Sequence, residues 1–235
     1  MRDPYLFEDI DVLKNKFNIR DAKELELAES ELSSFKLIEL DENPPRSFSV
    51  DFIKFIHKYV FENVYEWAGE YRSINIYKEE PLLTGLSVEY CDKSNIEKEL
   101  KHAVEKLNQI DWIGLDNKIA IIELAKSLSA LWRIHPFREG NTRTVITFFT
   151  LFLRQKGFEV DRELLKKHSA YVRNALVMAS IDKYAEYEHL EKILADAVFS
   201  KSPDIEKEQT EFDKYEMIKD YKVRDYKTTP LKHKK

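Results

Sequence analysis

Two apolar segments flank one short polar stretch in the second half of the chain, and this contrast is the strongest feature of the hydrophobic pattern. Between residues 117 and 132 apolar side chains occupy nearly every face of a helix, and between residues 145 and 153 they are almost continuous. Helices that are apolar on all sides are typical of a protein interior. The pattern therefore predicts two buried helices joined by a polar loop, Ile134–Thr144.

Two more helices are predicted upstream. Asp21 is a suitable N-cap for a helix that runs to about Leu40, and Ser49 is a suitable N-cap for a second helix that continues to about Trp67. His57 lies on the apolar face of the second helix, where a structural role is expected rather than a catalytic one. In the first helix one stripe is expected to face the core, and it consists of Leu25, Ala28, Leu32, Phe35 and Ile38.

A short β-hairpin is expected between these helices and the later ones. Tyr71–Tyr77 has the composition of a strand, and Leu82–Val88 offers a return strand after the turn residue Pro81. An ordinary connection between two helices is the alternative for this segment. Because most predicted elements are helical, the expected fold class is all-α with one small hairpin. Further helices are predicted over residues 94–108, 163–180 and 185–199.

Length and composition fit one main domain with extensions. The chain has 235 residues, of which 43% are hydrophobic, and this is enough for a sizeable core. We divide the chain into an N-terminal arm and helix (1–46), a main domain (47–200) and a charged C-terminal helix or tail (201–235). Charges of both signs are mixed along that last segment, which is typical of solvated or disordered chain.

Charge and cysteine content narrow the classes of partner and compartment. A net charge of −5 argues against nucleic acid or an anionic membrane as the main partner, because both attract basic surfaces. The single cysteine, Cys91, excludes an internal disulfide, and no apolar run reaches the ~18 residues of a membrane span. The first residues lack the apolar segment of a signal peptide, so we expect a cytoplasmic location.

The polar loop carries residue types that suit phosphate chemistry. His135 can accept a proton near neutral pH, and Glu139 is an oxygen ligand of the kind that Mg²⁺ prefers. Gly140 allows a close approach to the backbone, Asn141 can donate from its amide, and Arg143 offers a fork for phosphate oxygens. The loop also opens a helix, whose first N–H groups favour anions. Taken singly, each residue could be a helix cap or part of a solvated turn; together they predict an anion cradle beside a catalytic base.

This stretch resembles the signature of the Fic family, His-x-Phe-x-(Asp/Glu)-Gly-Asn-Gly-Arg-x-x-Arg. The matching positions are His135, Phe137, Glu139, Gly140, Asn141 and Arg143. Three further segments also resemble bacterial Fic proteins, and they are Val12–Lys16, Tyr65–Arg72 and Tyr171–Ser180. The chain departs from the signature at Thr142, where the second glycine is usual, and at Ile146, where the final arginine is usual.

The resemblance implies a Fic-type helical bundle whose hairpin forms a flap over the active site. Most Fic enzymes transfer AMP from ATP to a hydroxyl side chain of a target protein, which adds to the flap as a strand. His135 would be the catalytic base and Glu139 the ligand of Mg²⁺. Tyr171 lies where the family forms its adenine side, although a place in the core or at the rim fits its spacing as well. The implied nucleotide-binding residues are Arg138, Glu139, Gly140, Asn141, Thr142, Arg143, Lys78 and Tyr171.

Two alternatives to AMP transfer remain open from the sequence. Thr142 and Ile146 fit a nucleotide-binding regulatory module with little turnover, and the loop alone also fits a Fic variant that transfers another phosphate-containing group. Many Fic proteins are inhibited by a Glu that pairs with the signature's final arginine. Ile146 removes that arginine, and Ser202–Glu206 reads as an ordinary helix start, so we expect control by a separate partner, oligomerisation or substrate supply. Automodification is also expected.

Overall fold

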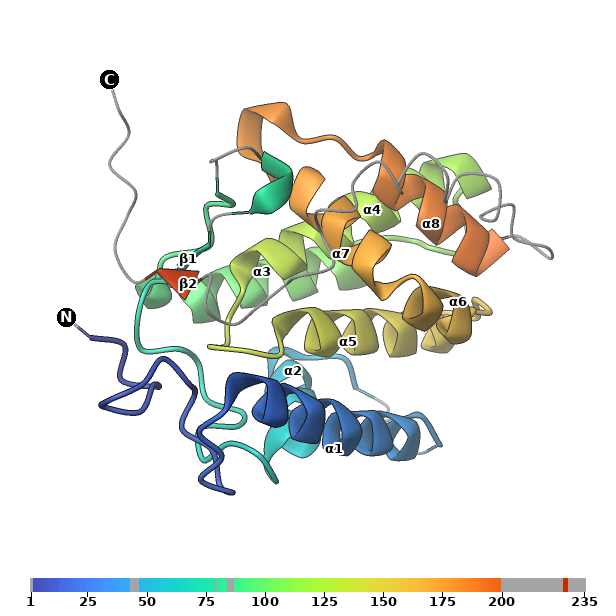
Figure 1. Ribbon diagram of the computed structural model, residues 1–235. Coiled ribbons are helices and arrows are strands. Elements are labelled where there is room, and N and C mark those ends of the chain that lie inside the picture. The colour runs from blue at the N-terminus through green and yellow to red at the C-terminus, as the bar shows by residue number, and fades with distance from the viewer. Residues whose placement is uncertain (1, 43–46, 79, 84–86, 200–225, 228–235) are drawn as a thin grey trace.

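The structure is a computed structural model that describes residues 2–42, 47–78, 80–83, 87–199 and 226–227 (Figure 1). These residues are mainly helical, which confirms the predicted all-α class. Of the expected C-terminal tail, all but Tyr226–Lys227 lies outside the described residues, and so does the segment Ser202–Glu206. The helices are α1 (Ala22–Glu42), α2 (Val50–Phe61), α3 (Ile96–Gln109), α4 (Asn117–Ile134), α5 (Asn141–Gln155), α6 (Arg162–Lys167), α7 (Ser169–Met178) and α8 (Glu188–Phe199).

Helix α5 runs through the centre of the molecule. It lies between α1 and α2 on one side and the group of α4, α7 and α8 on the other (Figure 1). Its apolar segment is buried, as the sequence predicted, and Phe148, Phe149 and Phe152 are each at most 1% exposed. Burying large apolar side chains on several faces of one helix provides much of the hydrophobic stabilisation of a domain. Because α4 and α5 are both fixed in this core, the loop between them is held at both ends.

Two predicted helix starts are confirmed by their caps. The Asp21 carboxylate accepts hydrogen bonds from the backbone N–H groups of Lys23 and Glu24, at 2.9 and 3.0 Å. The Ser49 hydroxyl accepts from the Phe52 N–H at 3.3 Å. Helix α2 ends at Phe61, earlier than expected, and residues 62–69 form turns instead.

The predicted core face of α1 is partly wrong. Leu25 is buried, but Phe35 and Ile38 are 68% and 59% exposed. The buried face instead includes two polar residues, Glu29 and Ser33, of which 8% and 1% is exposed. Both hydrogen-bond to Arg143 of α5, so the helix is rotated to bring these polar partners inward.

The expected hairpin differs in its strand pairing. Strand β1 is limited to Tyr77–Lys78, and it pairs antiparallel with β2, Tyr226–Lys227, near the C-terminus. The expected return segment starts with a 3₁₀ turn, Pro81–Leu83, and residues 84–86 lie outside the described residues. The partner that the structure gives to β1 is therefore distant in sequence, as the two adjacent strands in Figure 1 show.

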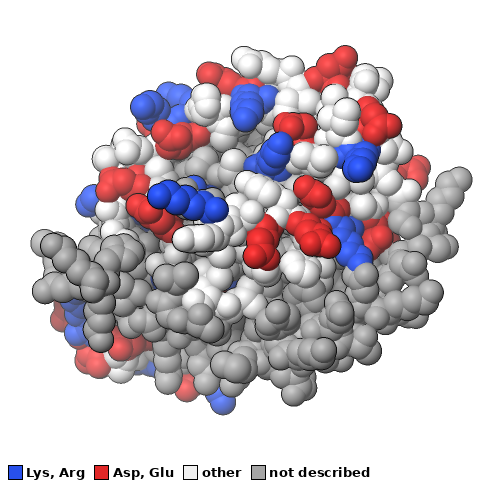
Figure 2. All heavy atoms as spheres, turned by 90° about the horizontal axis from the view of Figure 1, so that it is seen from above, with Lys and Arg blue, Asp and Glu red and all other residues white. Residues whose placement is uncertain are grey.

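The molecular surface carries charges of both signs. On the face seen in Figure 2, acidic and basic side chains are interspersed over the part drawn in colour. Within the described ranges, every helix is too short or too polar to cross a lipid bilayer.

Candidate phosphate site at the start of α5

The loop between α4 and α5 depends on two left-handed backbone positions. His135 is the C-cap of α4 with a φ of 49°, and its N–H donates to the Trp132 carbonyl at 3.1 Å. Gly140 is the N-cap of α5 with a φ of 76°. A Cβ atom at Gly140 would lie 2.4 Å from Cε2 of Phe61, so only glycine fits between the loop and α2. The two positions turn the chain sharply at each end of the loop.

Two residues, Asn141 and Arg72, fix the middle of the loop. The Asn141 side chain closes it on itself, because its Oδ1 accepts from the Phe137 N–H and its Nδ2 donates to the Phe137 carbonyl, both at 2.8 Å. Arg72 supports it from outside with two donors: its N–H donates to the Pro136 carbonyl at 2.9 Å, and its Nε donates to the His135 carbonyl at 2.8 Å. The amide of Asn141, predicted to bind nucleotide, is thus engaged in shaping the loop.

His57 supports the loop through hydrogen bonds and ring stacking, as expected for a structural histidine. Its Nδ1 accepts from the Gly69 N–H at 2.8 Å, so its Nε2 carries the proton and donates to the Glu139 carbonyl at 3.0 Å. Its ring also stacks on Phe137, with centroids 3.8 Å apart. Burial lowers the pKa of His57 to about 3, and the charge of Arg143 acts in the same direction. His57 is therefore a neutral part of the scaffold.

A cavity of about 140 Å³ opens in front of this loop. It joins the C-terminal end of α4 to the first turn of α5, where Gly140 lacks a side chain that could cap the helix. N–H groups in a first helical turn have no partner within the helix and attract anions. The lining residues are Trp132, His135, Glu139, Gly140, Asn141, Thr142, Arg143 and Arg173.

His135 lies in this lining with only 3% of its surface exposed. Its imidazole stacks on Tyr90, and the indole of Trp132 meets it edge-on with centroids 5.3 Å apart. Burial lowers the pKa of His135 well below its ordinary value, and the positive charges of Arg72, Arg173 and Lys78 add to this effect. The ring is therefore neutral at physiological pH and able to accept a proton.

The carboxylate of Glu139 has one oxygen that could ligate a metal ion. Its Oε1 accepts from the Gly140 N–H at 2.9 Å, whereas its Oε2 is buried and has no hydrogen-bond partner in the described part of the chain. A buried carboxylate oxygen without a donor is costly unless something else compensates it. Among the residues that the structure describes, no group of three or more His, Cys, Asp or Glu side chains could hold a metal. A single carboxylate such as that of Glu139 suits ions that take most of their ligands from water and substrate, as Mg²⁺ does.

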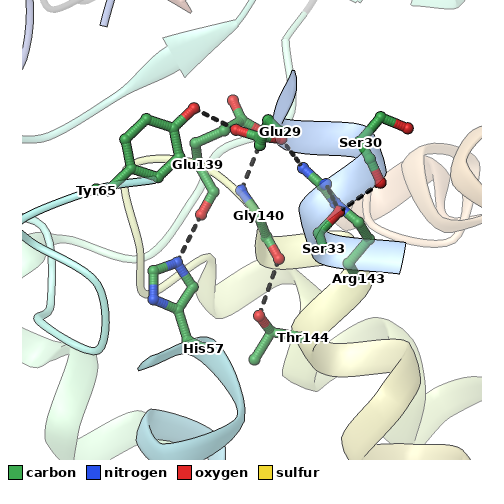
Figure 3. A network of polar contacts seen from close by, with 9 residues as sticks. All are labelled: Glu29, Ser30, Ser33, His57, Tyr65, Glu139, Gly140, Arg143 and Thr144. Atoms are coloured by element: carbon green, nitrogen blue, oxygen red, sulfur yellow. Dashed lines mark hydrogen bonds and ion pairs between the residues drawn. The ribbon is translucent and has the colours of Figure 1, made fainter. Parts of the chain in front are cut away.

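Arg143 lines the cavity and is held by α1 (Figure 3). Its Nη1 donates to the Ser33 hydroxyl at 2.8 Å, its Nη2 pairs with Glu29, and its guanidinium lies over the Phe61 ring at 4.7 Å. The Tyr65 hydroxyl donates to the other oxygen of Glu29. This network fixes the position of the guanidinium at the cavity wall.

Thr142, which replaces the second glycine of the signature, also has a defined place. Its hydroxyl accepts a hydrogen bond from the Trp132 indole at 2.8 Å. The added side chain is thus held against the end of α4 and borders the cavity.

The other predicted nucleotide-binding side chains lie away from the cavity lining. Arg138 is 1% exposed and pairs with Asp3, with both its Nε and Nη2 at 2.8 Å from one carboxylate oxygen. Lys78 is fully buried, and it influences the cavity through its charge on His135. Tyr171 contacts α8, since its hydroxyl lies 3.4 Å from Nδ1 of His189. Burial raises the pKa of Tyr171 to about 12, and Asp196 and Glu188 add to the effect.

The sequence did not identify Arg173, which among the described residues is the one lining residue outside 132–143. It is two positions from Tyr171, which was singled out, but residues two apart on a helix face in nearly opposite directions. The signal that could have identified Arg173 was its charge within the mostly apolar helix α7. Glu29 and Ser33 were also missed, because the apolar residues of α1 suggested a different buried face.

Comparisons with known proteins agree with the loop chemistry. Residues 47–153 match the Fic/DOC family. The chain is 32% identical over 168 residues to the probable protein adenylyltransferase y4lH of Sinorhizobium fredii, covering 71% of this chain and 83% of that protein. It is 25% identical over 169 residues to the probable protein adenylyltransferase Fic of Escherichia coli, covering 72% and 80%. The N-terminal FIC domain of Bep8 from Bartonella sp. 1-1C has a similar fold, with a TM-score of 0.68, 25% identity, and coverage of 82% and 93%.

Proposed function

This chain belongs to the Fic/DOC family, and on that premise we propose that it is a protein adenylyltransferase. It transfers AMP from ATP to a hydroxyl side chain of a target protein and releases pyrophosphate. One observation carries the proposal: a single cavity brings together a neutral buried histidine, a carboxylate, an arginine and the open first turn of a helix. The adenylyltransferase names of the two relatives support the same reaction.

His135 acts as the general base in this reaction. An imidazole nitrogen takes the proton from the target hydroxyl while that oxygen attacks the α-phosphorus of ATP. A new phosphorus–oxygen bond forms, the bond from the α-phosphorus to the bridging oxygen breaks, and pyrophosphate leaves with the electron pair. General base catalysis of this kind contributes about 10²- to 10⁴-fold in rate. Arg72 and Tyr90 hold the imidazole in place, through the His135 carbonyl and the ring face respectively.

The start of α5 and Arg143 bind the phosphates. The first-turn N–H groups of α5 offer oriented donors, and the guanidinium of Arg143 supplies a positive charge at the same wall. Donors that are already oriented do not need to reorganise when negative charge develops in the transition state. The Glu29 and Ser33 contacts of Arg143 thus serve the reaction by fixing its guanidinium beforehand.

Glu139 would hold Mg²⁺ through its buried Oε2. When bound, this ion neutralises negative charge on the phosphate oxygens. The hydrogen bond from the Gly140 N–H holds the other carboxylate oxygen, Oε1, and so limits the rotation of the carboxylate of this lining residue.

The target protein would dock by adding a strand to β1, and automodification would use the same edge. The pairing of Tyr77–Lys78 with Tyr226–Lys227 supports this, because it shows an edge that accepts an extended segment in antiparallel register. A target strand would replace β2 there. Since ATP is the substrate, the cytoplasm is the compartment that fits the activity. Control of the activity by a separate regulatory partner is also proposed.

Labelled ATP tests the function directly. The full chain is incubated with Mg²⁺ and either α-labelled or γ-labelled ATP, alone and with a bacterial protein extract, and labelled protein is resolved on a gel. We expect protein label from α-labelled ATP only, and no label with His135→Ala. Label from γ-labelled ATP would indicate transfer of another phosphate group. No protein label from either donor, together with measurable ATP binding, would indicate a nucleotide-binding module.

A further inference from the structure

One side chain of α7 lines the cavity together with residues from the end of α4 and the start of α5. Arg173 lies in the middle of α7, and its side chain is 17% exposed. It borders the same cavity as His135 and Arg143. Its positive charge also lowers the pKa of His135, as expected for two groups that line the same cavity.

A buried carboxylate holds Arg173 in this place. Glu80 is 1% exposed and accepts two parallel hydrogen bonds, from Nη1 to Oε2 and from Nη2 to Oε1, each 3.0 Å long. Paired bonds between a guanidinium and a carboxylate fix both the distance and the plane of the arginine. Tyr90, whose ring supports His135, also reaches Glu80 at 3.4 Å. The segment after β1, the base and α7 are thus linked through one carboxylate.

Two arginines therefore face one small cavity from different helices. Each is paired with a glutamate of another segment, Arg143 with Glu29 and Arg173 with Glu80. A guanidinium in such a pair carries a full positive charge and N–H donors of the kind that bind phosphate oxygens. By contrast, Ile146, at the signature's last arginine position, packs against the hydrophobic core and is not part of the cavity lining.

We propose that Arg173, which reaches the cavity from α7, binds the β- and γ-phosphates of the nucleotide. This rests on the proposed use of ATP. A phosphate chain that crosses the cavity from the base would meet Arg143 on one side and Arg173 on the other. Arg173 is thus a substrate-binding residue, and it supplies from α7 the second guanidinium that α5 does not carry. Its ligand is the triphosphate part of the nucleotide and not the nucleoside.

The test compares two ligands on two arginine variants. Binding of α,β-methylene-ATP, which cannot transfer AMP, and of AMP is measured by calorimetry with Mg²⁺ for the wild type and Arg173→Gln. We expect Arg173→Gln to weaken the triphosphate about 10- to 100-fold, as for loss of charge-assisted hydrogen bonds, and AMP less than about threefold. The matched control is Arg154→Gln, since Arg154 is 43% exposed at the other end of α5 and pairs with Asp41. It should change neither affinity.

The binding results for Arg173→Gln decide whether this arginine contacts the triphosphate. Unchanged triphosphate affinity in Arg173→Gln would overturn the proposal, and so would an equal loss for both ligands, because that would indicate a structural role. If Arg173→Gln does not fold, Arg173→Lys is used in the same comparison, where a selective loss for the triphosphate is again expected. The labelling experiment is separate: AMP transfer by the wild type with normal triphosphate binding by Arg173→Gln would remove this inference and leave the proposed function intact.

Discussion

The imidazole of His135 lies against the phenol ring of Tyr90, with centroids 4.0 Å apart and ring planes at 27°. Tyr90 is 7% exposed, and burial followed by the charge of Glu80 raises its pKa well above the ordinary value. The phenol therefore stays protonated and covers one face of the histidine. This stack shields one face of the imidazole from water, and an imidazole that is removed from water stays neutral.

The first prediction is that AMP transfer does not show the pH dependence of an ordinary histidine. Because the pKa of His135 lies well below 6.5, the ring stays unprotonated as the pH falls through 6.5. The initial rate at saturating ATP should therefore be nearly constant from about pH 7.5 to 6. Tyr90→Ala would let water reach the ring, so the pKa of His135 should rise toward its ordinary value and the rate should fall more between pH 7.5 and 6 than in the wild type. A wild-type inflection at 6.5 would contradict this account of the stack.

The second prediction concerns His135 itself. His135→Ala should reduce transfer by about 10²-fold or more, because it removes the general base. ATP affinity should stay within a few-fold, since the phosphates are bound by other groups. His57→Ala makes a useful comparison: His57 hydrogen-bonds to Gly69 and Glu139, so its loss should lower the melting temperature. If His135→Ala kept more than about a tenth of the wild-type rate, another group would be the base.

The third prediction follows from the buried Oε2 of Glu139. Glu139→Gln keeps the side-chain volume but removes the charge, so it should weaken Mg²⁺-dependent ATP binding and slow transfer. Binding is titrated with Mg²⁺ and with EDTA. The control is Glu66→Gln, because that side chain is 84% exposed. Identical ATP titrations of the wild type with and without Mg²⁺ would count against Glu139 as a metal ligand.

The fourth prediction is a stability effect at the N-terminal arm. Asp3 neutralises Arg138, and their side chains are 5% and 1% exposed. Asp3→Asn would remove the carboxylate charge that pairs with a buried guanidinium and should lower the free energy of unfolding by about 3 kcal/mol. Urea unfolding measures this difference. The matched change Asp9→Asn affects an exposed pair with Arg20 and should leave the unfolding curve almost unchanged. Equal effects of the two variants would show that the arm is not anchored through Arg138.

Much of the fold was predictable because the strongest signals are local. The all-round apolar segments of α4 and α5 have few alternatives to burial, and the loop between them contains enough chemistry to indicate its family. Asp21 and Ser49 are caps whose partners lie within four residues. Signals of this range can be read directly from a sequence.

The missed features depend on pairs that are distant along the chain. Glu29 and Arg143 are 114 residues apart, and Glu80 and Arg173 are 93 apart. Each buried charge is explained only by its partner, and propensity alone favours an apolar residue in such a place. For the same reason the buried face of α1 was misjudged, and Arg138 gave no sign that its partner is Asp3.

The last prediction isolates the reason for glycine at the start of α5. Gly140 and Gly157 have similar left-handed backbones, with φ values of 76° and 90°. A Cβ at Gly157 would meet nothing within 4 Å, so Gly157→Ala should cost only the backbone penalty, about 1–2 kcal/mol. At Gly140 the Cβ would also collide with the Phe61 ring, which is fully buried and cannot move aside freely. Gly140→Ala should therefore destabilise the protein by roughly 3 kcal/mol or more in urea unfolding.

Gly140→Ala should also slow AMP transfer, because the loop that carries His135 and Glu139 must shift, whereas Gly157→Ala should leave the rate unchanged. Equal effects of the two substitutions would show that the contact between Gly140 and Phe61 does not position the loop.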